Sequence, residues 1–212
     1  HDGMIEKAEK YVKLGFKSIK MQVAHCFTND EDIANVRDMR KALGDNIGIM
    51  IDVNQGWGVE ETIKVSKAIE KYNPEWLEEP VMADDFEGYQ EICKSISIPV
   101  VTGENNFTHN DLLPFMKNKK ISILQPDIMR GGYTNLIFTS NLANEYGIKI
   151  APHMFPELSI HIVASIKNPS WLEYMGWYDH LWQEPLLPVN GTLKPSDRPG
   201  HGMDFKSEIC SF

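Results

Sequence analysis

Helix-like and strand-like segments alternate along the whole chain, and this alternation constrains the fold more than any other feature. The strand-like segments are too apolar to leave one face in water, so both faces should be buried. Such strands, joined by helices, form a parallel sheet that helices cover. The expected strands cover 18–23, 47–53, 76–80, 100–104, 121–127, 148–153 and 171–175. The expected helices cover 3–14, 30–43, 60–71, 85–95, 109–118, 132–146 and 157–167.

Each expected strand carries an ionisable residue at or near its end, and successive members lie about 20 to 32 residues apart. They are Lys20, Asp52, Glu78, Glu104, Asp127, His153 and Glu173. An open sheet would spread these groups apart, whereas a closed barrel brings them to one mouth. We therefore expect an α/β barrel. Because a closed barrel of this type needs one more strand, we expect that strand in an N-terminal part that this sequence lacks.

Three carboxylates stand on consecutive strands and form the clearest candidate site. Asp52, Glu78 and Glu104 would repel one another at one mouth unless a cation lay between them. Ligands that offer only oxygen favour a hard ion, and Mg²⁺ suits such a site while keeping positions for water and substrate. We interpret these residues as ligands of Mg²⁺, for which Mn²⁺ can substitute.

Acid–base groups are expected beside the metal ligands. His153 lies one strand–helix step after Asp127, and an Asp–His pair fixes the imidazole tautomer and raises its basicity. Lys20 should reach the same mouth and stabilise negative charge or act as a base. These groups suit removal of the weakly acidic proton next to a carboxylate, where the metal, Lys20 and Glu173 would stabilise the enediolate.

Composition narrows the class of protein. The net charge of −9 and the absence of a basic stripe argue against nucleic-acid binding. The odd number of cysteines, without CxxC spacing, indicates free thiols in a reducing compartment, so we expect a cytoplasmic protein. We expect no membrane span, because no apolar run approaches about 18–20 residues. We also expect no signal peptide. His1 is not an initiator Met, so a targeting segment can be missing from this sequence.

Several segments resemble the enolase superfamily, mandelate racemase subgroup. They are GFKSIKMQV, IDVNQGW, WLEEP, TGENN, LQPDIMRGGYTN, APHMFPELSIHI and WLEYM, in the family's order. The resemblance implies a modified TIM-like (β/α)7β barrel, with strands 2 to 8 in residues 1–184. It implies that residues 185–212 pack toward an α+β capping domain absent from this sequence. A small-molecule carboxylate substrate and a homo-oligomer are also expected.

The resemblance also assigns roles to residues. It implies Mg²⁺ on Asp52, Glu78 and Glu104, and Asp127–His153 as the base. Glu173 would hydrogen-bond the substrate carboxylate. Asn54 matches a position that approaches the metal or the substrate.

One position departs from the family's Lys-x-Lys pattern. Gln22 stands in place of the second lysine, on the same strand face as Lys20. A glutamine binds substrate by hydrogen bonds but takes up no proton. One face of the α-carbon then lacks its usual base, which favours dehydration of a sugar acid or related hydroxy acid to a 2-keto acid over racemisation.

Three other interpretations remain open. Racemisation or epimerisation of an α-substituted carboxylate differs from dehydration only in the fate of the enediolate. A non-catalytic barrel that binds metal is a second alternative, although the intact set of acid–base groups argues against it. The third is a phosphate-binding barrel, indicated only by Gly131-Gly132 after the strand 121–127. A glycine pair at a helix start serves close packing equally well.

Overall fold

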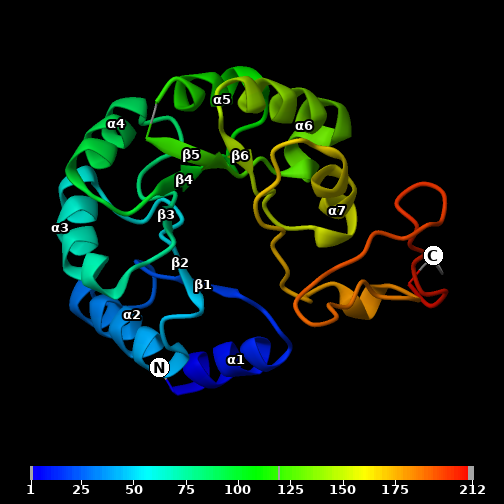
Figure 1. Ribbon diagram of the computed structural model, residues 1–212, viewed down its shortest axis with the longest axis horizontal. Helices are drawn as coiled ribbons and strands as arrows, with labels where there is room; N and C mark the ends of the chain where they lie inside the picture. Colours follow the sequence, from blue (N-terminus) through cyan, green and yellow to red (C-terminus); the bar gives the residue numbers. More distant parts are fainter. Residues whose placement is uncertain (1, 119, 210–212) are drawn as a thin grey trace.

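A computed structural model describes residues 2–118 and 120–209 and shows a curved parallel sheet with helices on its outer side (Figure 1). The strands described are β1 (Ser18–Gln22), β2 (Gly48–Asp52), β3 (Trp76–Glu78), β4 (Val100–Thr102), β5 (Ile121–Leu124) and β6 (Lys149–Ile150). The helices are α1 (Asp2–Lys13), α2 (Asn29–Leu43), α3 (Val59–Ile69), α4 (Phe86–Ser95), α5 (His109–Met116), α6 (Ile128–Glu145) and α7 (Pro156–Ser165). Two short 3-10 helices are η1 (Glu70–Tyr72) and η2 (Asp179–Leu181).

The order of the strands in space decides between the two sheet types that fit the sequence pattern. The sheet runs β1-β2-β3-β4-β5-β6, and every neighbouring pair is parallel. A doubly wound sheet reverses its strand order at a switch point, whereas a barrel keeps chain order. Figure 1 shows α1 to α7 following one another around the outside of the curve. The barrel-like fold predicted from the sequence is confirmed.

Alternate residues of the strands fill two separate cores. Ile49 and Ile51 of β2 are fully buried in the large cluster between sheet and helices. Met50, between them, packs with Trp76 and Val101 in a small cluster on the inner side of the sheet. Burial of one such side chain stabilises the fold by about 1.5–3 kcal/mol. The apolar runs are continuous because both faces of the sheet are covered.

The seventh strand expected over 171–175 is not formed. The chain there makes an isolated parallel bridge between Ile150 and Pro169, and the following segment contains no strand. Ile150 donates to the carbonyl of Asn168, and Ser170 donates to the carbonyl of Ile150. Since β6 is only two residues long and no described strand pairs with the other side of 171–175, the ladder does not extend. Glu173 therefore stands on an irregular segment.

Helix α6 begins earlier than the sequence pattern predicted. The expected start was residue 132, but the helix begins at Ile128 because Asp127 caps it. Gly132 lies inside this helix with φ of 70° and ψ of 170°, a non-helical conformation with positive φ that glycine adopts without strain. Gly132 marks a kink between two helical pieces, and the apolar pattern begins only after that kink.

Two expectations from composition concern cysteines and membranes. Cys26 and Cys93 are free thiols, as predicted, and Cys210 lies outside the described residues. No helix in the described part of the chain is both long and apolar enough to cross a membrane.

Candidate active site

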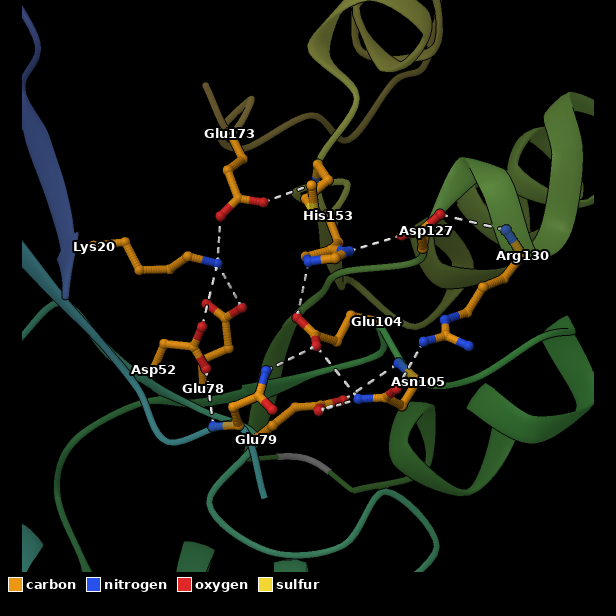
Figure 2. A network of polar contacts seen from close by, with 12 residues as sticks. Lys20, Asp52, Glu78, Glu79, Glu104, Asn105, Asp127, Arg130, His153 and Glu173 are labelled. Atoms are coloured by element: carbon orange, nitrogen blue, oxygen red, sulfur yellow. Dashed lines mark hydrogen bonds and ion pairs between the residues drawn. The ribbon is translucent and has the colours of Figure 1, made fainter. Parts of the chain in front are cut away.

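The residues predicted for the site lie together at one mouth of the sheet (Figure 2). A cavity of about 900 Å³ opens there. Its lining includes Lys20, Gln22, Asp52, Asn54, Glu104, His153 and Glu173. Glu78 and Asp127 do not line the cavity, but they contact Lys20 and His153, which do. The fold thus brings every predicted residue into one neighbourhood, while the role of each stays a prediction.

Strand register explains why the first two carboxylates are neighbours. Gln22 pairs with Asp52 between β1 and β2, and Asp52 pairs with Glu78 between β2 and β3. Paired residues of parallel strands point to the same face of a sheet. Both acids are buried, with Asp52 8% exposed and Glu78 fully covered. Two negative charges are thereby held side by side away from water.

Glu104 is brought to the same mouth by an unusual backbone. Gly103, just after β4, has φ of +135°. A Cβ at this position would lie 2.8 Å from the backbone nitrogen of Gln125, so a larger residue would push the two strand ends apart. Glycine lets the chain turn there without that clash and places Glu104, 6% exposed, beside the other two acids.

The ammonium group of Lys20 lies among three carboxylates. Its Nζ is 2.8 Å from Glu78 Oε1, 2.5 Å from Glu173 Oε1 and 3.7 Å from Asp52 Oδ2. Burial alone would lower the pKa of Lys20, but the charge of Glu78 and of the other two acids raises this pKa above its ordinary value. Lys20 is therefore a cation that balances part of the negative charge at the mouth.

Two of the acids are costly to ionise where they stand. Burial, followed by the charge of Glu78, raises the pKa of Asp52 to about 7, although Lys20 opposes the shift. Burial raises the pKa of Glu104 to about 8, although His153 opposes it. Buried carboxylates that crowd one another lose their protons less readily than exposed ones. A bound divalent cation would relieve the crowding.

The three expected metal ligands have suitable chemistry, but their side chains do not converge as they stand. Glu104 Oε2 is buried and has no hydrogen-bond partner in the described structure, which suits a metal ligand. Among the described residues, however, no three His, Cys, Asp or Glu side chains are grouped so that they could hold an ion. The ammonium of Lys20 lies against Asp52 and Glu78 instead. A metal ion held by these acids would compete with the ammonium of Lys20 for Asp52 and Glu78.

His153 and Asp127 form a hydrogen-bonded pair. Their backbones meet in a parallel bridge, and His153 Nδ1 lies 2.7 Å from Asp127 Oδ2. Burial alone would lower the pKa of His153, but the hydrogen bond to Asp127 and the charge of Glu104 raise it. Burial alone would raise the pKa of Asp127, but its hydrogen bonds to His153 and to backbone amides lower it. The pair is arranged as the sequence predicted.

The other ring nitrogen of His153 faces the acids. Nε2 lies 3.3 Å from Glu104 Oε2, so the imidazole stands between its aspartate and the cluster of carboxylates. Glu173 approaches from the opposite side, where its Oε2 accepts a hydrogen bond from the backbone nitrogen of Met154. Figure 2 shows Lys20 and His153 on two sides of the space below Glu173.

Gln22 and Asn54 complete the set of predicted residues. Gln22 is exposed and lines the cavity on the same strand as Lys20. Asn54 Nδ2 lies 3.4 Å from Glu104 Oε1, and its backbone nitrogen donates to Asp52 Oδ1 at 3.0 Å. Asn54 therefore links two of the acids, consistent with the position that the resemblance assigned to it.

Sequence analysis did not single out two polar residues behind the carboxylates. Asn105 donates to Glu79 Oε2 and to Glu104 Oε1, and it accepts from Arg130. Asn105 directly follows the predicted ligand Glu104, and Arg130 stands three residues after Asp127. This proximity was the available signal, but it gave no indication that the two side chains meet. Glu79, the residue after the predicted ligand Glu78, also contacts Asn105.

Comparison with known proteins places the chain in a family. Residues 3–209 match the model of a family described as enolase C-terminal domain-like. The chain belongs to this family. The resemblance indicated by the motifs is thereby confirmed.

Individual relatives agree with this placement. L-talarate/galactarate dehydratase of Salmonella typhimurium is 33% identical over 194 residues, covering 90% of this chain and 48% of that enzyme. 3,6-Anhydro-alpha-L-galactonate cycloisomerase of Streptomyces coelicolor is 30% identical over 204 residues, covering 94% and 56%. The crystal structure of L-talarate dehydratase from Polaromonas sp. JS666, complexed with Mg and L-glucarate, has a TM-score of 0.91 and 29% identity, covering 99% and 58%. The chain spans about half the length of the curated relatives it matches.

Proposed function

We propose that this member of the enolase C-terminal domain-like family removes the proton α to the carboxylate of a sugar acid or related hydroxy acid. Loss of the β-hydroxyl then gives a 2-keto acid. The observation that carries the proposal is the position of His153, which is hydrogen-bonded to Asp127 on one side and faces the carboxylate cluster on the other.

His153 is the proposed base. Its Nδ1 contacts Asp127 Oδ2, which favours the tautomer with the proton on Nδ1 and leaves Nε2 as the proton acceptor. Nε2 points toward the acids, where a substrate carboxylate would be held. The imidazolium formed by proton abstraction is stabilised by the charge of Asp127 and can return its proton to the departing hydroxyl.

Asp52, Glu78 and Glu104 are the proposed ligands of Mg²⁺, with Mn²⁺ as a substitute. When bound, the ion supplies a Lewis acid that polarises the substrate carboxylate and stabilises the charge that develops on it. Lys20 would then turn from Asp52 and Glu78 toward the substrate and donate to the same developing charge. Glu173, already in contact with Lys20, is placed to hydrogen-bond the substrate carboxylate.

Gln22 supports dehydration over racemisation. It lines the cavity on the same strand as Lys20 and carries no group that takes up a proton. The L-talarate/galactarate dehydratase that shares 33% of its residues with this chain supports the same reaction class and a sugar-acid substrate. We therefore propose that the protein is a dehydratase that uses a single base.

The proposal is tested by incubating the full-length protein with Mg²⁺ and a library of sugar acids and trapping 2-keto products with semicarbazide. We expect a keto acid from at least one substrate and a fall in turnover of about 10²–10⁴-fold in His153→Asn. His109→Asn is the matched control, because its ring contacts Asn135 and Phe138 and does not line the cavity. Unchanged turnover in His153→Asn would show that the proposed base is wrong.

Racemisation or epimerisation is the second candidate. Lys20 Nζ and His153 approach the space at the mouth from two sides, so Lys20 is placed to serve a second face of the substrate (Figure 2). The cycloisomerase relative supports isomerase chemistry in the family. An epimerised acid without any keto product would identify this reaction instead.

A further inference from the structure

A chain of hydrogen bonds behind the mouth joins Glu104 to the Asp127–His153 pair through residues that the proposed mechanism does not use (Figure 2). We propose that Asn105 is a positioning residue that holds the carboxylate of Glu104 in one orientation, and that Arg130 acts through it. The inference rests on the proposed function, since it takes Glu104 to be a metal ligand.

Asn105 uses both hydrogens of its amide on carboxylates. Its Nδ2 lies 2.6 Å from Glu79 Oε2 and 3.3 Å from Glu104 Oε1. Its backbone nitrogen also donates to Glu79, at 3.4 Å from Oε1. An amide NH₂ group has two protons, so these two contacts use its full donor capacity. The orientation of Glu104 is thereby tied to a residue that is itself anchored.

The anchor is Glu79, which is fully buried. It follows β3 with φ of +37°, in the left-handed region that non-glycine residues seldom adopt. Left-handed backbone is unfavourable for a residue with a side chain and persists where surrounding contacts demand it. A buried carboxylate also requires donors, and Asn105 supplies them through its side chain and its backbone. Glu79 directly follows the proposed metal ligand Glu78. A role in holding Asn105 explains why a buried acid with a strained backbone stands there.

Arg130 fixes which way the amide of Asn105 faces. Its guanidinium donates to Asn105 Oδ1 at 2.9 Å and lies 5.2 Å from the ring centre of Phe107. A flipped amide would set its NH₂ group against the guanidinium and its oxygen against two carboxylates. Arg130 therefore permits one orientation, in which the NH₂ group faces Glu104.

The two carboxylate oxygens of Glu104 therefore have different contacts. Oε1 is held by Asn105 and approached by Asn54 at 3.4 Å. Oε2 is buried, has no hydrogen-bond partner among the described residues, and faces His153 Nε2 at 3.3 Å. The hydrogen bonds to Oε1 thus keep Oε2 available to bind the cation. The backbone nitrogen of Arg130 also donates to Asp127, so one segment at the start of α6 supports both the ligand and the base.

The test measures the affinity of the full-length protein for Mn²⁺ by the electron paramagnetic resonance signal of the free ion. Asn105→Leu keeps the approximate volume and removes the hydrogen bonds, and we expect the Kd to rise about 10- to 100-fold. Arg130→Met is the second variant. It removes a positive charge near a cation site, which alone would tighten Mn²⁺ binding, so a weaker affinity in this variant indicates lost positioning.

A double-mutant cycle shows whether Arg130 acts through Asn105. In the Asn105→Leu background, Arg130→Met should cost no further affinity. Arg37→Met is the matched control for removal of an exposed arginine, because Arg37 pairs with its neighbour Asp38 on α2, and it should leave the Kd unchanged.

Failure of the positioning role and failure of the proposed function give different results. If the unmodified protein binds Mn²⁺ and both variants bind it as tightly, the positioning role is wrong and the metal site stands. If the unmodified protein binds no divalent cation, the proposed function fails and this inference fails with it. Should Asn105→Leu not fold, the exposed Arg130→Met variant decides the question alone.

Discussion

At the scale of single residues, the identity of one side chain at the mouth separates two reactions that share an intermediate. Gln22 and Lys20 stand two positions apart on β1 and both line the cavity. Lys20 is engaged by three carboxylates, and Gln22 is exposed to the cavity. Because glutamine takes up no proton, His153 is the base in the proposed mechanism, and we expect abstraction from one face only.

Changing Gln22 to lysine should supply the absent second base. We expect Gln22→Lys to exchange the α-proton of a bound sugar acid on both faces, so that the substrate slowly epimerises. The measurement is the configuration of recovered substrate after incubation in D₂O, read by NMR. A Gln22→Met variant, which adds no base, serves as the control and should give no epimer. Epimer formation in both variants would contradict proton abstraction from only one face of the α-carbon.

At the level of helices and strands, the sequence predicted features that follow from local residue patterns. It missed features that depend on contacts with residues distant in the chain. The positions of the carboxylates could be expected because Asp52 and Glu78 end apolar strands and Glu104 closely follows one, and register then sets Asp52 beside Glu78. The strand expected over 171–175 failed because a strand needs a ladder partner, which apolar spacing does not reveal. The start of α6 was misplaced because the capping role of Asp127 was not recognised. The contact of Asn105 with Arg130 joins the turn after β4 to the first turn of α6 and has no periodic signature.

Asp127 both caps helix α6 and hydrogen-bonds to His153, and two substitutions separate these roles. Its Oδ1 accepts from the backbone nitrogens of Met129 and Arg130 at the start of α6, while Oδ2 contacts His153. Asparagine is as good an N-cap as aspartate. We expect Asp127→Asn to keep stability and lose turnover, whereas Asp127→Ala should lose turnover and about 1 kcal/mol of stability.

Urea unfolding together with steady-state rates measures both effects. Thr28→Ala is the control, because Thr28 caps α2 in a capping box with Glu31. It should cost a similar free energy of unfolding and leave turnover intact. Full turnover in Asp127→Asn would show that the charge of Asp127 does not assist His153.

At the scale of the whole molecule, the sheet gathers buried negative charge at one mouth and balances it only in part. Asp52, Glu78 and Glu104 are each under 10% exposed, and the ammonium of Lys20 lies against Asp52 and Glu78. Folding therefore works against repulsion that a divalent cation would remove. The stability of the molecule should depend on that ion, even though the curved sheet has its own apolar core.

Added Mg²⁺ should raise the melting temperature of the full-length protein, and EDTA should reverse the rise. At a concentration 100 times the Kd, binding to the folded state alone adds about 2.7 kcal/mol to the free energy of unfolding. Asp52→Asn should abolish most of this increase, whereas Asp45→Asn, which changes an exposed acid, should retain it. An equal increase in both variants would place the ion elsewhere.

In the proposed mechanism, one base removes the α-proton and loss of the β-hydroxyl follows. The most direct measurement is the NMR spectrum of a sugar acid turned over by the unmodified protein in D₂O with Mg²⁺. We expect a 2-keto acid and no deuterated epimer in the remaining substrate. Exchange on both faces of the α-carbon, without a keto product, would contradict this mechanism.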